Sequence, residues 1–172
     1  LNDLKIYDAV IDPNGPAMSW SIHSIVSREV GEEARADAYF KKSYQDNVRG
    51  PFKIWHEGYG VFGGITNFIT GSGGWLQSLW AGYGGLHIHD DLLEIRNPRT
   101  PPNCTSLQLR HVNYLGNVFN VVITVDNGWT LQLMNSKLRA PTLNVEVSGK
   151  VQRLGTHRIS MLPGSSAKIY RA

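Results

Sequence analysis

The chain has 172 residues, of which 41% are hydrophobic and 18% charged, a composition typical of a globular protein and unlike that of a disordered one. The formal net charge of +3 is unevenly placed, because residues 1–89 contain seven Lys/Arg and nine Asp/Glu, whereas residues 90–172 contain ten and five. This asymmetry suggests two unlike halves, and the lack of basic clusters argues against a nucleic-acid partner.

The single cysteine, one short motif and the lengths of the apolar runs limit further which class of protein this can be. Cys104 is the only cysteine, which excludes an internal disulfide. It lies within Asn103-Cys104-Thr105, which fits the N-glycosylation pattern and makes Asn103 a candidate acceptor. No apolar run is long enough to span a membrane, and no signal peptide is recognisable. The chain begins at Leu1 rather than Met, which suggests a processed product or a fragment.

The first half is predicted to be helical. After a dense turn signal over 12–16, a helix is expected to about Val30, where Gly31 stops it, with its apolar face formed by Met18, Ile22, Ile25 and Val26. A second helix is expected from Glu32 to before Gly50-Pro51, with one face lined by Ala36, Phe40 and Tyr44. The two helices would form an antiparallel hairpin, and His23 is interpreted as a packed or hydrogen-bonded core residue rather than a ligand.

The next stretch, residues 52–77, combines one acidic residue with many glycines and reads FKIWHEGYGVFGGITNFITGSGGWLQ. Glu57 stands among Trp55, His56 and Tyr59, and such glycine density lets the backbone approach a ligand closely. Two interpretations stay open here: a ligand site around Glu57, or tight turns that carry a solvated charge.

A third helix follows, with the spacing of Leu76, Leu79, Trp80 and Tyr83 and an end at Gly84-Gly85. Its aromatic face is expected to be core. Three helices with this much apolar surface cannot cover one another, so they are expected to belong to a larger helical layer.

From Leu86 the pattern changes to period two, and strands are expected over residues 92–95, 106–115, 118–125, 129–133, 143–147, 156–162 and 167–170. The clearest alternation is Val121, Ile123 and Val125, and hairpin turns are expected at Gly116-Asn117 and Asn127-Gly128. Short strands with regular turns predict an antiparallel β-sandwich. Asp90 and Asp91, before the first strand, are interpreted as solvated charges.

Three segments carry a family resemblance: GPAMSWSIHSIV at 15–26, FKIWHEG at 52–58 and NFITGSGGWLQSLWAGYGGLHI at 67–88. In this order they resemble the C-terminal end of glycoside hydrolase family 65 proteins. The resemblance implies a mixed α and β fold, in which residues 1–89 are the last helices and catalytic loop of an (α/α)6 barrel and residues 90–172 a small antiparallel β-sandwich.

The same resemblance suggests a branch of the family. Its phosphorylases typically carry a His and a Ser at the places of Asn67 and Thr70, whereas its hydrolases place a Glu after a Trp in the preceding loop, where Glu57 stands. The chain therefore looks like the hydrolase branch, closest to acid-trehalase-like enzymes that remove glucose from glucosyl-galactosyl-hydroxylysine. One departure is His56, at a position that is commonly Thr in those relatives.

Roles for individual residues follow from the resemblance. An inverting hydrolase needs a general acid and, on the opposite face of the sugar, a general base that activates water. By this resemblance Glu57 is the general base and Trp55 forms an apolar wall near the sugar. The loop around 67–73 positions backbone groups and the water. Lys53, Asn67 and Thr70 are weaker candidates for sugar contacts. No metal and no cofactor are expected.

The general acid of the family lies upstream of anything present here. The leading hypothesis is therefore the C-terminal chain of an inverting α-glucoside hydrolase, held noncovalently to an N-terminal chain of the same precursor. A non-catalytic binding or structural protein is the alternative, and a disaccharide phosphorylase is the third. The sequon and the apparent processing suggest a secreted or a lysosomal or vacuolar location.

Overall fold

A computed structural model describes residues 2–16, 18–58, 64–126 and 128–172. It divides the chain into two compact units, Leu1–Gly82 and Tyr83–Ala172, each of which is described by itself. The domain boundary expected from the sequence lay a few residues later, between 89 and 90. Tyr59, Gly60, Gly63 and Asn127 lie outside the described residues.

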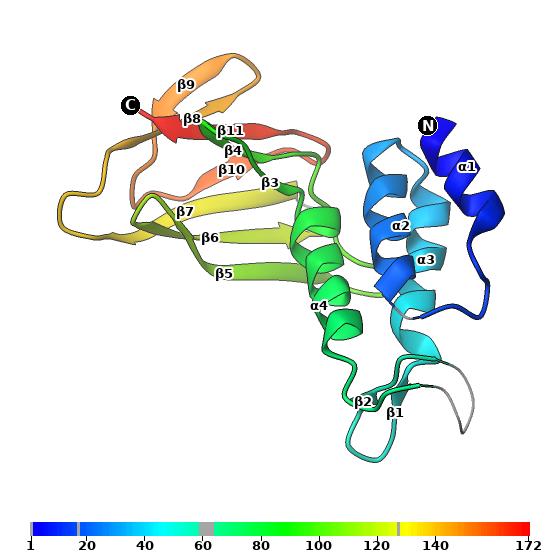
Figure 1. The fold of residues 1–172 in the computed structure, drawn as a ribbon. Helices are drawn as coiled ribbons and strands as arrows, with labels where there is room; N and C mark the ends of the chain where they lie inside the picture. The colour runs from blue at the N-terminus through cyan, green and yellow to red at the C-terminus, as the bar shows by residue number, and fades with distance from the viewer. Residues whose placement is uncertain (1, 17, 59–63, 127) are drawn as a thin grey trace. The chain divides into compact units, whose positions relative to one another are not determined.

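The first unit consists of helices and one short hairpin (Figure 1). Its elements are α1 Asn2–Val10, α2 Met18–Glu29, α3 Glu33–Gln45, β1 Val48–Arg49, β2 Ile54–Trp55 and α4 Ile69–Gln77, which continues as a π-helical turn over Ser78–Tyr83. Gly31, with φ +79°, ends α2 as predicted. Helix α1 and the β1–β2 hairpin were not predicted from the sequence.

Helix α2 buries the face opposite to the one expected. Its buried residues are Trp20, Ser21, Ser24, Ser27 and Arg28. Most of the predicted apolar stripe stays on the surface, since Met18, Ile22 and Val26 are 43%, 47% and 37% exposed, whereas its fourth member, Ile25, is half-buried. The reason is close packing by small side chains: the Ser21 Cβ lies 3.2 Å from the place a Cβ on Gly74 would take.

Helix α4 begins at Ile69, so Gly71, Gly73 and Gly74 lie inside a helix and not in the loop expected over 67–73. The glycines allow close approach, because a Cβ on Gly71 would lie 2.8 Å from the Trp55 Nε1. The aromatic face of the predicted third helix is only partly buried, because Tyr83 is fully buried, whereas Trp80 is 37% exposed.

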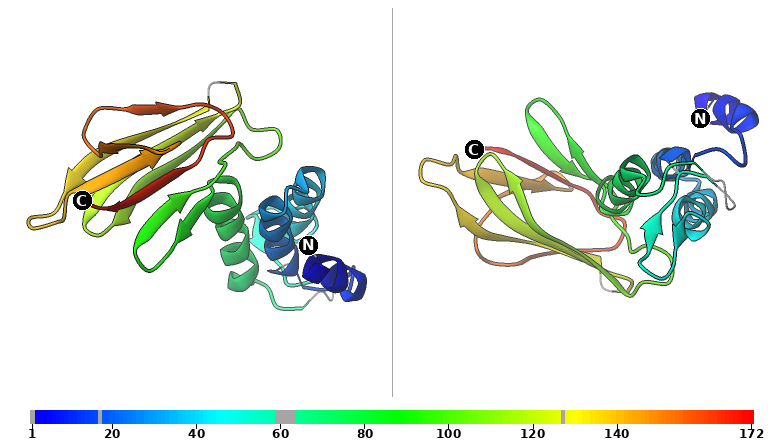
Figure 2. Two further views of the ribbon diagram at one scale, coloured as in Figure 1. Left: turned by 90° about the horizontal axis from the view of Figure 1, so that it is seen from above. Right: turned by 60° about the horizontal axis from the view of Figure 1, so that its bottom comes forward.

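The second unit contains two antiparallel sheets, of four strands in the order β10-β7-β6-β5 and of five in the order β3-β4-β11-β8-β9 (Figure 2). The strands are β3 Leu86–Ile88, β4 Leu92–Ile95, β5 Ser106–Tyr114, β6 Asn117–Thr124, β7 Gly128–Ser136, β8 Leu143–Val147, β9 Lys150–Arg153, β10 Ile159–Met161 and β11 Ala167–Arg171. Strands β3 and β9 were not predicted, and β10 is shorter than the predicted 156–162.

Both sheets contribute to a single hydrophobic core, as expected for a β-sandwich. Its largest fully buried side chains include Trp129, Phe119, Leu93, Ile95 and Ile123. The indole Nε1 of Trp129 donates to the carbonyl of Ser165 at 3.2 Å, so its polar atom is satisfied inside the core. The predicted mixed α and β fold is therefore confirmed.

Two expectations about β6 need correction. The alternation predicted through Val125 ends earlier, because β6 stops at Thr124 and Val125 is 58% exposed. The hairpin turn is Leu115-Gly116, with φ values of +51° and +79°, and not Gly116-Asn117. Asn117 is instead the first strand residue, buried, and its Nδ2 donates to Pro141 O at 2.9 Å.

Candidate active site

Glu57 follows β2, and its backbone is held on two sides. On one side the buried Asn47 accepts a hydrogen bond from His56 N at 2.8 Å, and its Nδ2 donates to His56 O at 3.0 Å and Glu57 O at 3.3 Å. On the other side Glu57 N donates to Ile65 O at 3.1 Å, next to an antiparallel bridge between His56 and Thr66. The position of this residue is therefore fixed by segments before and after it in the chain.

The carboxylate of Glu57 is held at one oxygen. Ile65 N donates to Glu57 Oε2 at 3.1 Å, whereas Oε1 has no hydrogen bond with any residue that the structure describes. Gly64 lies against this side chain with φ +73°, and a Cβ there would meet Oε2 at 2.5 Å. Glu57 is half-buried, and the protein orients one of its carboxylate oxygens, whereas the other is unbonded among the described residues.

Trp55 packs inward rather than standing alone on the surface. Its ring lies 5.9 Å from that of Trp75, and Trp75 in turn stacks on Phe40 at 6.2 Å. The Trp55 Nε1 is buried and has no hydrogen-bond partner among the described residues. The aromatic cluster thus supports strand β2, which ends two residues before Glu57.

The weaker candidates lie on the same hairpin and loop but are exposed. Lys53 and Asn67 adopt left-handed backbone conformations, with φ +57° and +59°. Asn67 lies between Thr66, which bridges to His56, and Phe68, whose N–H donates to Trp55 O at 2.9 Å. Segments 55–57 and 65–68 are thereby brought side by side, which places Asn67 near the site, whereas Thr70 lies in the first turn of α4.

Sequence reasoning missed the residues that hold Glu57. Asn47 sits at the end of α3 and Gly64 and Ile65 in a glycine-rich loop, and no pattern in the sequence connects them with position 57. Their roles depend on pairing between segments that only the folded chain brings together.

Other residues singled out from the sequence lie elsewhere. His23 Nδ1 is 2.7 Å from Asp8 Oδ1, in agreement with a hydrogen-bonded core histidine. Asp90 and Asp91 are exposed, and Asn103 is exposed in a turn with φ +61°. No group of three or more His, Cys, Asp or Glu in the described ranges is arranged to hold a metal ion. Among the same residues, none of the helices is long and apolar enough to cross a membrane.

Comparison with known proteins identifies three groups of relatives. The chain is 42% identical over 120 residues to a protein-glucosylgalactosylhydroxylysine glucosidase from Dictyostelium discoideum, a match that covers 70% of this chain and 16% of that protein. It is 37% identical to a cell wall acid trehalase from Arthroderma benhamiae, over 64% of this chain and 11% of that protein. It is 33% identical to a kojibiose hydrolase from Mucilaginibacter mallensis, over 64% and 16%. No family model and no solved structure matches the chain.

These matches have two consequences. The chain spans less than a fifth of the length of these three relatives. A match of 120 contiguous residues in a chain of 172 includes positions 53–120 wherever it begins, so the first match contains the Glu57 loop. The resemblance drawn from the sequence is confirmed: the chain is related to glycosidases of the glycoside hydrolase family 65 type, whose matches cover 64–70% of it.

Proposed function

We propose that the chain is part of an inverting α-glucoside hydrolase that acts on a glucosyl disaccharide unit, with Glu57 as the general base. The names of the relatives support the reaction class, since they are a glucosidase, an acid trehalase and a kojibiose hydrolase. The observation that carries the assignment of Glu57 is its half-buried carboxylate, held at Oε2 by the Ile65 N–H, with Oε1 unbonded among the residues that the structure describes.

The proposed reaction uses this arrangement directly. In an inverting hydrolase the base carboxylate removes a proton from the attacking water while a carboxylic acid, about 6.5–9.5 Å away, protonates the leaving oxygen. Glu57 Oε1 accepts the water proton, and the Ile65 N–H keeps the other oxygen in place. Trp55, two residues before the base, is the proposed apolar wall near the sugar, and Asn67, on the segment paired with 55–57, is the candidate for a contact with sugar hydroxyls.

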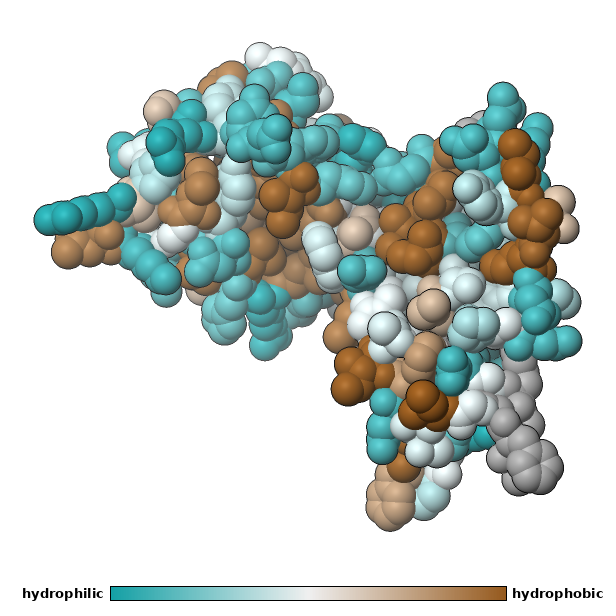
Figure 3. Space-filling view, viewed as in Figure 1, coloured by the Kyte–Doolittle hydropathy of each residue, from teal (hydrophilic) through white to brown (hydrophobic). Residues whose placement is uncertain are grey.

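The general acid is proposed to come from a part of the protein outside these 172 residues. The helical unit leaves apolar side chains uncovered on α1 and α2, where Ile6, Tyr7 and Val10 are 61%, 64% and 73% exposed and the α2 stripe is also open. Figure 3 shows hydrophobic side chains gathered over these two helices on the face in view. Further helices of an (α/α)6 barrel, on an N-terminal part that binds noncovalently, would cover this surface.

A secreted or a lysosomal or vacuolar location is part of the proposal. One relative is named a cell wall acid trehalase, and Asn103 lies exposed in its sequon. Mass spectrometry of the protein before and after removal of N-glycans would show whether Asn103 is modified.

The test is the substitution Glu57→Gln in the complete protein that contains this chain. Glu146→Gln is the matched control, because it removes a carboxylate from strand β8 of the other unit. We expect turnover of a glucosyl disaccharide to collapse in Glu57→Gln while the disaccharide still binds, and to remain unchanged in the control. Proton NMR of the wild-type reaction should show β-glucose as the first product from an α-linked substrate.

Other outcomes would change the assignment. Unchanged turnover in Glu57→Gln would remove Glu57 from catalysis. Binding without any turnover by the wild-type protein would favour the non-catalytic alternative. Turnover that requires inorganic phosphate would favour the phosphorylase, against which Asn67 and Thr70 argue.

A further inference from the structure

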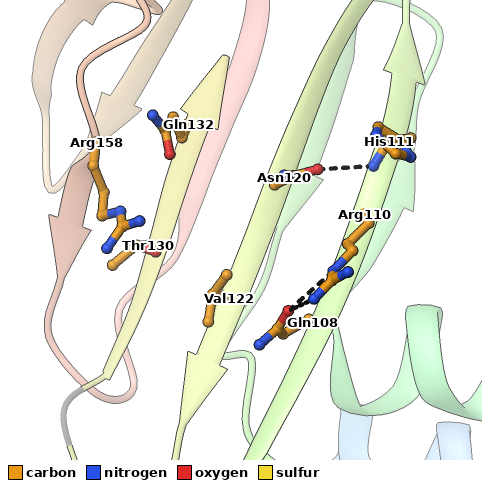
Figure 4. A pocket seen from close by; sticks show the side chains of 8 residues that line it. All are labelled: Gln108, Arg110, His111, Asn120, Val122, Thr130, Gln132 and Arg158. Atoms are coloured by element: carbon orange, nitrogen blue, oxygen red, sulfur yellow. Dashed lines mark hydrogen bonds between the residues drawn. The ribbon is translucent and has the colours of Figure 1, made fainter. Parts of the chain in front are cut away.

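A hollow lies in the β unit, on the outer face of the four-stranded sheet. It measures about 510 Å³ and is lined by Gln108, Arg110, His111, Asn120, Val122, Thr130, Gln132 and Arg158 (Figure 4). We call it the sheet groove. All eight residues belong to the second unit, whereas Glu57 and its loop belong to the first, so the groove shares no residue with the candidate active site.

Strand register explains how these residues meet. In one row Gln108 pairs with Val122, and Val122 with Thr130; in the next, Asn120 pairs with Gln132. Arg158 precedes Ile159, which pairs with Leu131, and therefore stands beside Gln132. Residues 107, 109, 112 and 114 of β5 are less exposed and belong to or pack on the core, so the remaining residues face outward.

A β-bulge adds a residue to this outer face. The register of β5 against β6 shifts between Leu109 and Val112, and Arg110 and His111 are consecutive exposed residues within the shift. His111 has φ +56°, and its N–H donates to Asn120 Oδ1 at 2.9 Å. The bulge thus places a guanidinium and an imidazole next to each other at one side of the groove, opposite Arg158 (Figure 4).

The polar groups of the groove are partly fixed and partly available. Gln108 Oε1 accepts from Arg110 Nε at 3.1 Å and from its second guanidinium nitrogen at 2.7 Å, and Gln132 Nε2 donates to Thr156 O at 3.0 Å. The opposite ends, Gln108 Nε2, Gln132 Oε1 and Asn120 Nδ2, have no hydrogen bond with any described residue. Preoriented amides with a free end are well suited to bind hydroxyl groups.

The charge of the groove is positive. Two arginines line it, none of the eight residues is acidic, and Arg158 forms no ion pair within the described chain. Arg110 lies on β5 and Arg158 immediately before β10, and these two strands are three interstrand spacings, about 14 Å, apart. The two guanidinium groups therefore frame the amides and Thr130 between them. No Trp, Tyr or Phe lines the groove, so it offers no aromatic platform for stacking a neutral sugar ring.

We propose that the sheet groove binds an acidic saccharide, whose carboxylates pair with Arg110 and Arg158 and whose hydroxyls bind Asn120, Gln132 and Thr130. Arginine suits carboxylates because its planar fork donates two parallel hydrogen bonds. A sheet face presents side chains rather than backbone groups, and an extended peptide instead pairs with the edge of a sheet. A ligand with hydroxyls around its whole perimeter therefore fits better than an acidic peptide.

The experiment is a titration of the ¹⁵N-labelled full chain with tetragalacturonate, followed by NMR and calorimetry. We expect shifts in the side-chain amide signals of Asn120 and Gln132, and a dissociation constant that rises with salt. Arg158→Gln and Arg110→Gln should each weaken binding about tenfold or more, since a hydrogen bond to a charged group contributes at least this much. Arg171→Gln, an exposed arginine on β11 of the other sheet, is the matched control and should bind as the wild type does.

Several binding results would contradict the proposal. No binding of tetragalacturonate, or equal binding by both groove variants with unchanged thermal midpoints, would overturn it. Equal binding of maltotetraose would show that charge is not recognised. Equal binding of tetraglutamate or of inorganic sulfate would show a general anion site and overturn the saccharide assignment. Glucosyl disaccharide turnover by the complete protein should be unaffected by Arg158→Gln, which separates this test from that of Glu57.

Discussion

Gly64→Ala tests whether the loop after Glu57 positions the carboxylate. Gly64 has φ +73°, where an L-residue costs about 1–2 kcal/mol, and its new Cβ would lie 2.5 Å from Glu57 Oε2 and 2.9 Å from Glu57 Cβ. The second contact is too short to persist, so the Glu57 side chain has to move and lose its hydrogen bond from Ile65. The substitution therefore combines a backbone cost with a displacement of the proposed base.

Gly31→Ala separates the two effects. Gly31 has nearly the same backbone, with φ +79°, but nothing lies within 4 Å of an added Cβ. Both variants should lower the free energy of unfolding of the helical unit by about 1–2 kcal/mol. Only Gly64→Ala should also lower kcat, by about a hundredfold, because a catalytic group misplaced by about 1 Å loses this much.

Urea denaturation followed by tryptophan fluorescence would measure the stability of both variants, and kcat would be measured on a glucosyl disaccharide with the complete protein. The reasoning is refuted if Gly64→Ala keeps wild-type kcat, or if Gly31→Ala loses as much. Equal loss would mean that the loop affects turnover through general stability and not through Glu57.

Three further predictions concern the rest of the chain. Burial raises the pKa of Tyr39 above its ordinary 10.0, and the hydrogen bond with Asp8 and the charge of Asp8 raise it further, whereas the charge of Arg35 lowers it. The folded state therefore holds the Tyr39 proton more tightly than the unfolded state does. The resulting stability is present below pH 10 and is lost as pH rises through the folded-state pKa. Urea denaturation between pH 8 and 11 should show this loss, and Tyr39→Phe should remove it. Ile123→Val should cost about 0.5–1.5 kcal/mol because Ile123 is buried, whereas Val125→Ala, at a side chain that is 58% exposed, should change stability by less than about 0.5 kcal/mol. Ile22→Ser on the exposed stripe of α2 should leave the stability of this chain nearly unchanged but weaken its association with an N-terminal part, measured by native mass spectrometry.

Each of these has an outcome that contradicts it. An alkaline loss of stability that persists in Tyr39→Phe would assign the effect to another group. Equal costs for Ile123→Val and Val125→Ala would contradict the burial of Ile123 and the end of β6 before Val125. Unfolding of the chain by Ile22→Ser would show that the α2 stripe is covered within the chain itself.

Local pattern predicted several elements closely. The strands expected over 92–95 and 143–147 have these bounds in the structure, because alternation and turn residues act within a few positions. The same kind of reasoning placed the end of α2 at Gly31, where the positive φ favours glycine. The same reasoning placed the α4 glycines in a loop, although they lie inside a helix. Gly71 and Gly74 are accommodated there because Trp55 and Ser21, respectively, approach them closely.

The buried face of α2 shows a second limit. Periodicity correctly grouped Met18, Ile22 and Val26 on one face, but the face that packs within the unit is lined by serines and Trp20. Which face is covered depends on the partner helices, and the apolar face here is only partly covered by the described residues of the unit.

By itself the sequence determined the mixed fold, the family and the identity of the candidate base, because these depend on local pattern and on ordered motifs. Only the tertiary structure decided how Glu57 is held, since Asn47, Gly64 and Ile65 reach it through pairing between separate segments. The tertiary structure also determined which side chains line the sheet groove, since they come from β5, β6, β7 and the residues just before β10. Strand order and the bulge at Arg110 and His111 created that surface, and both arise from hydrogen bonds between residues that are distant in the chain.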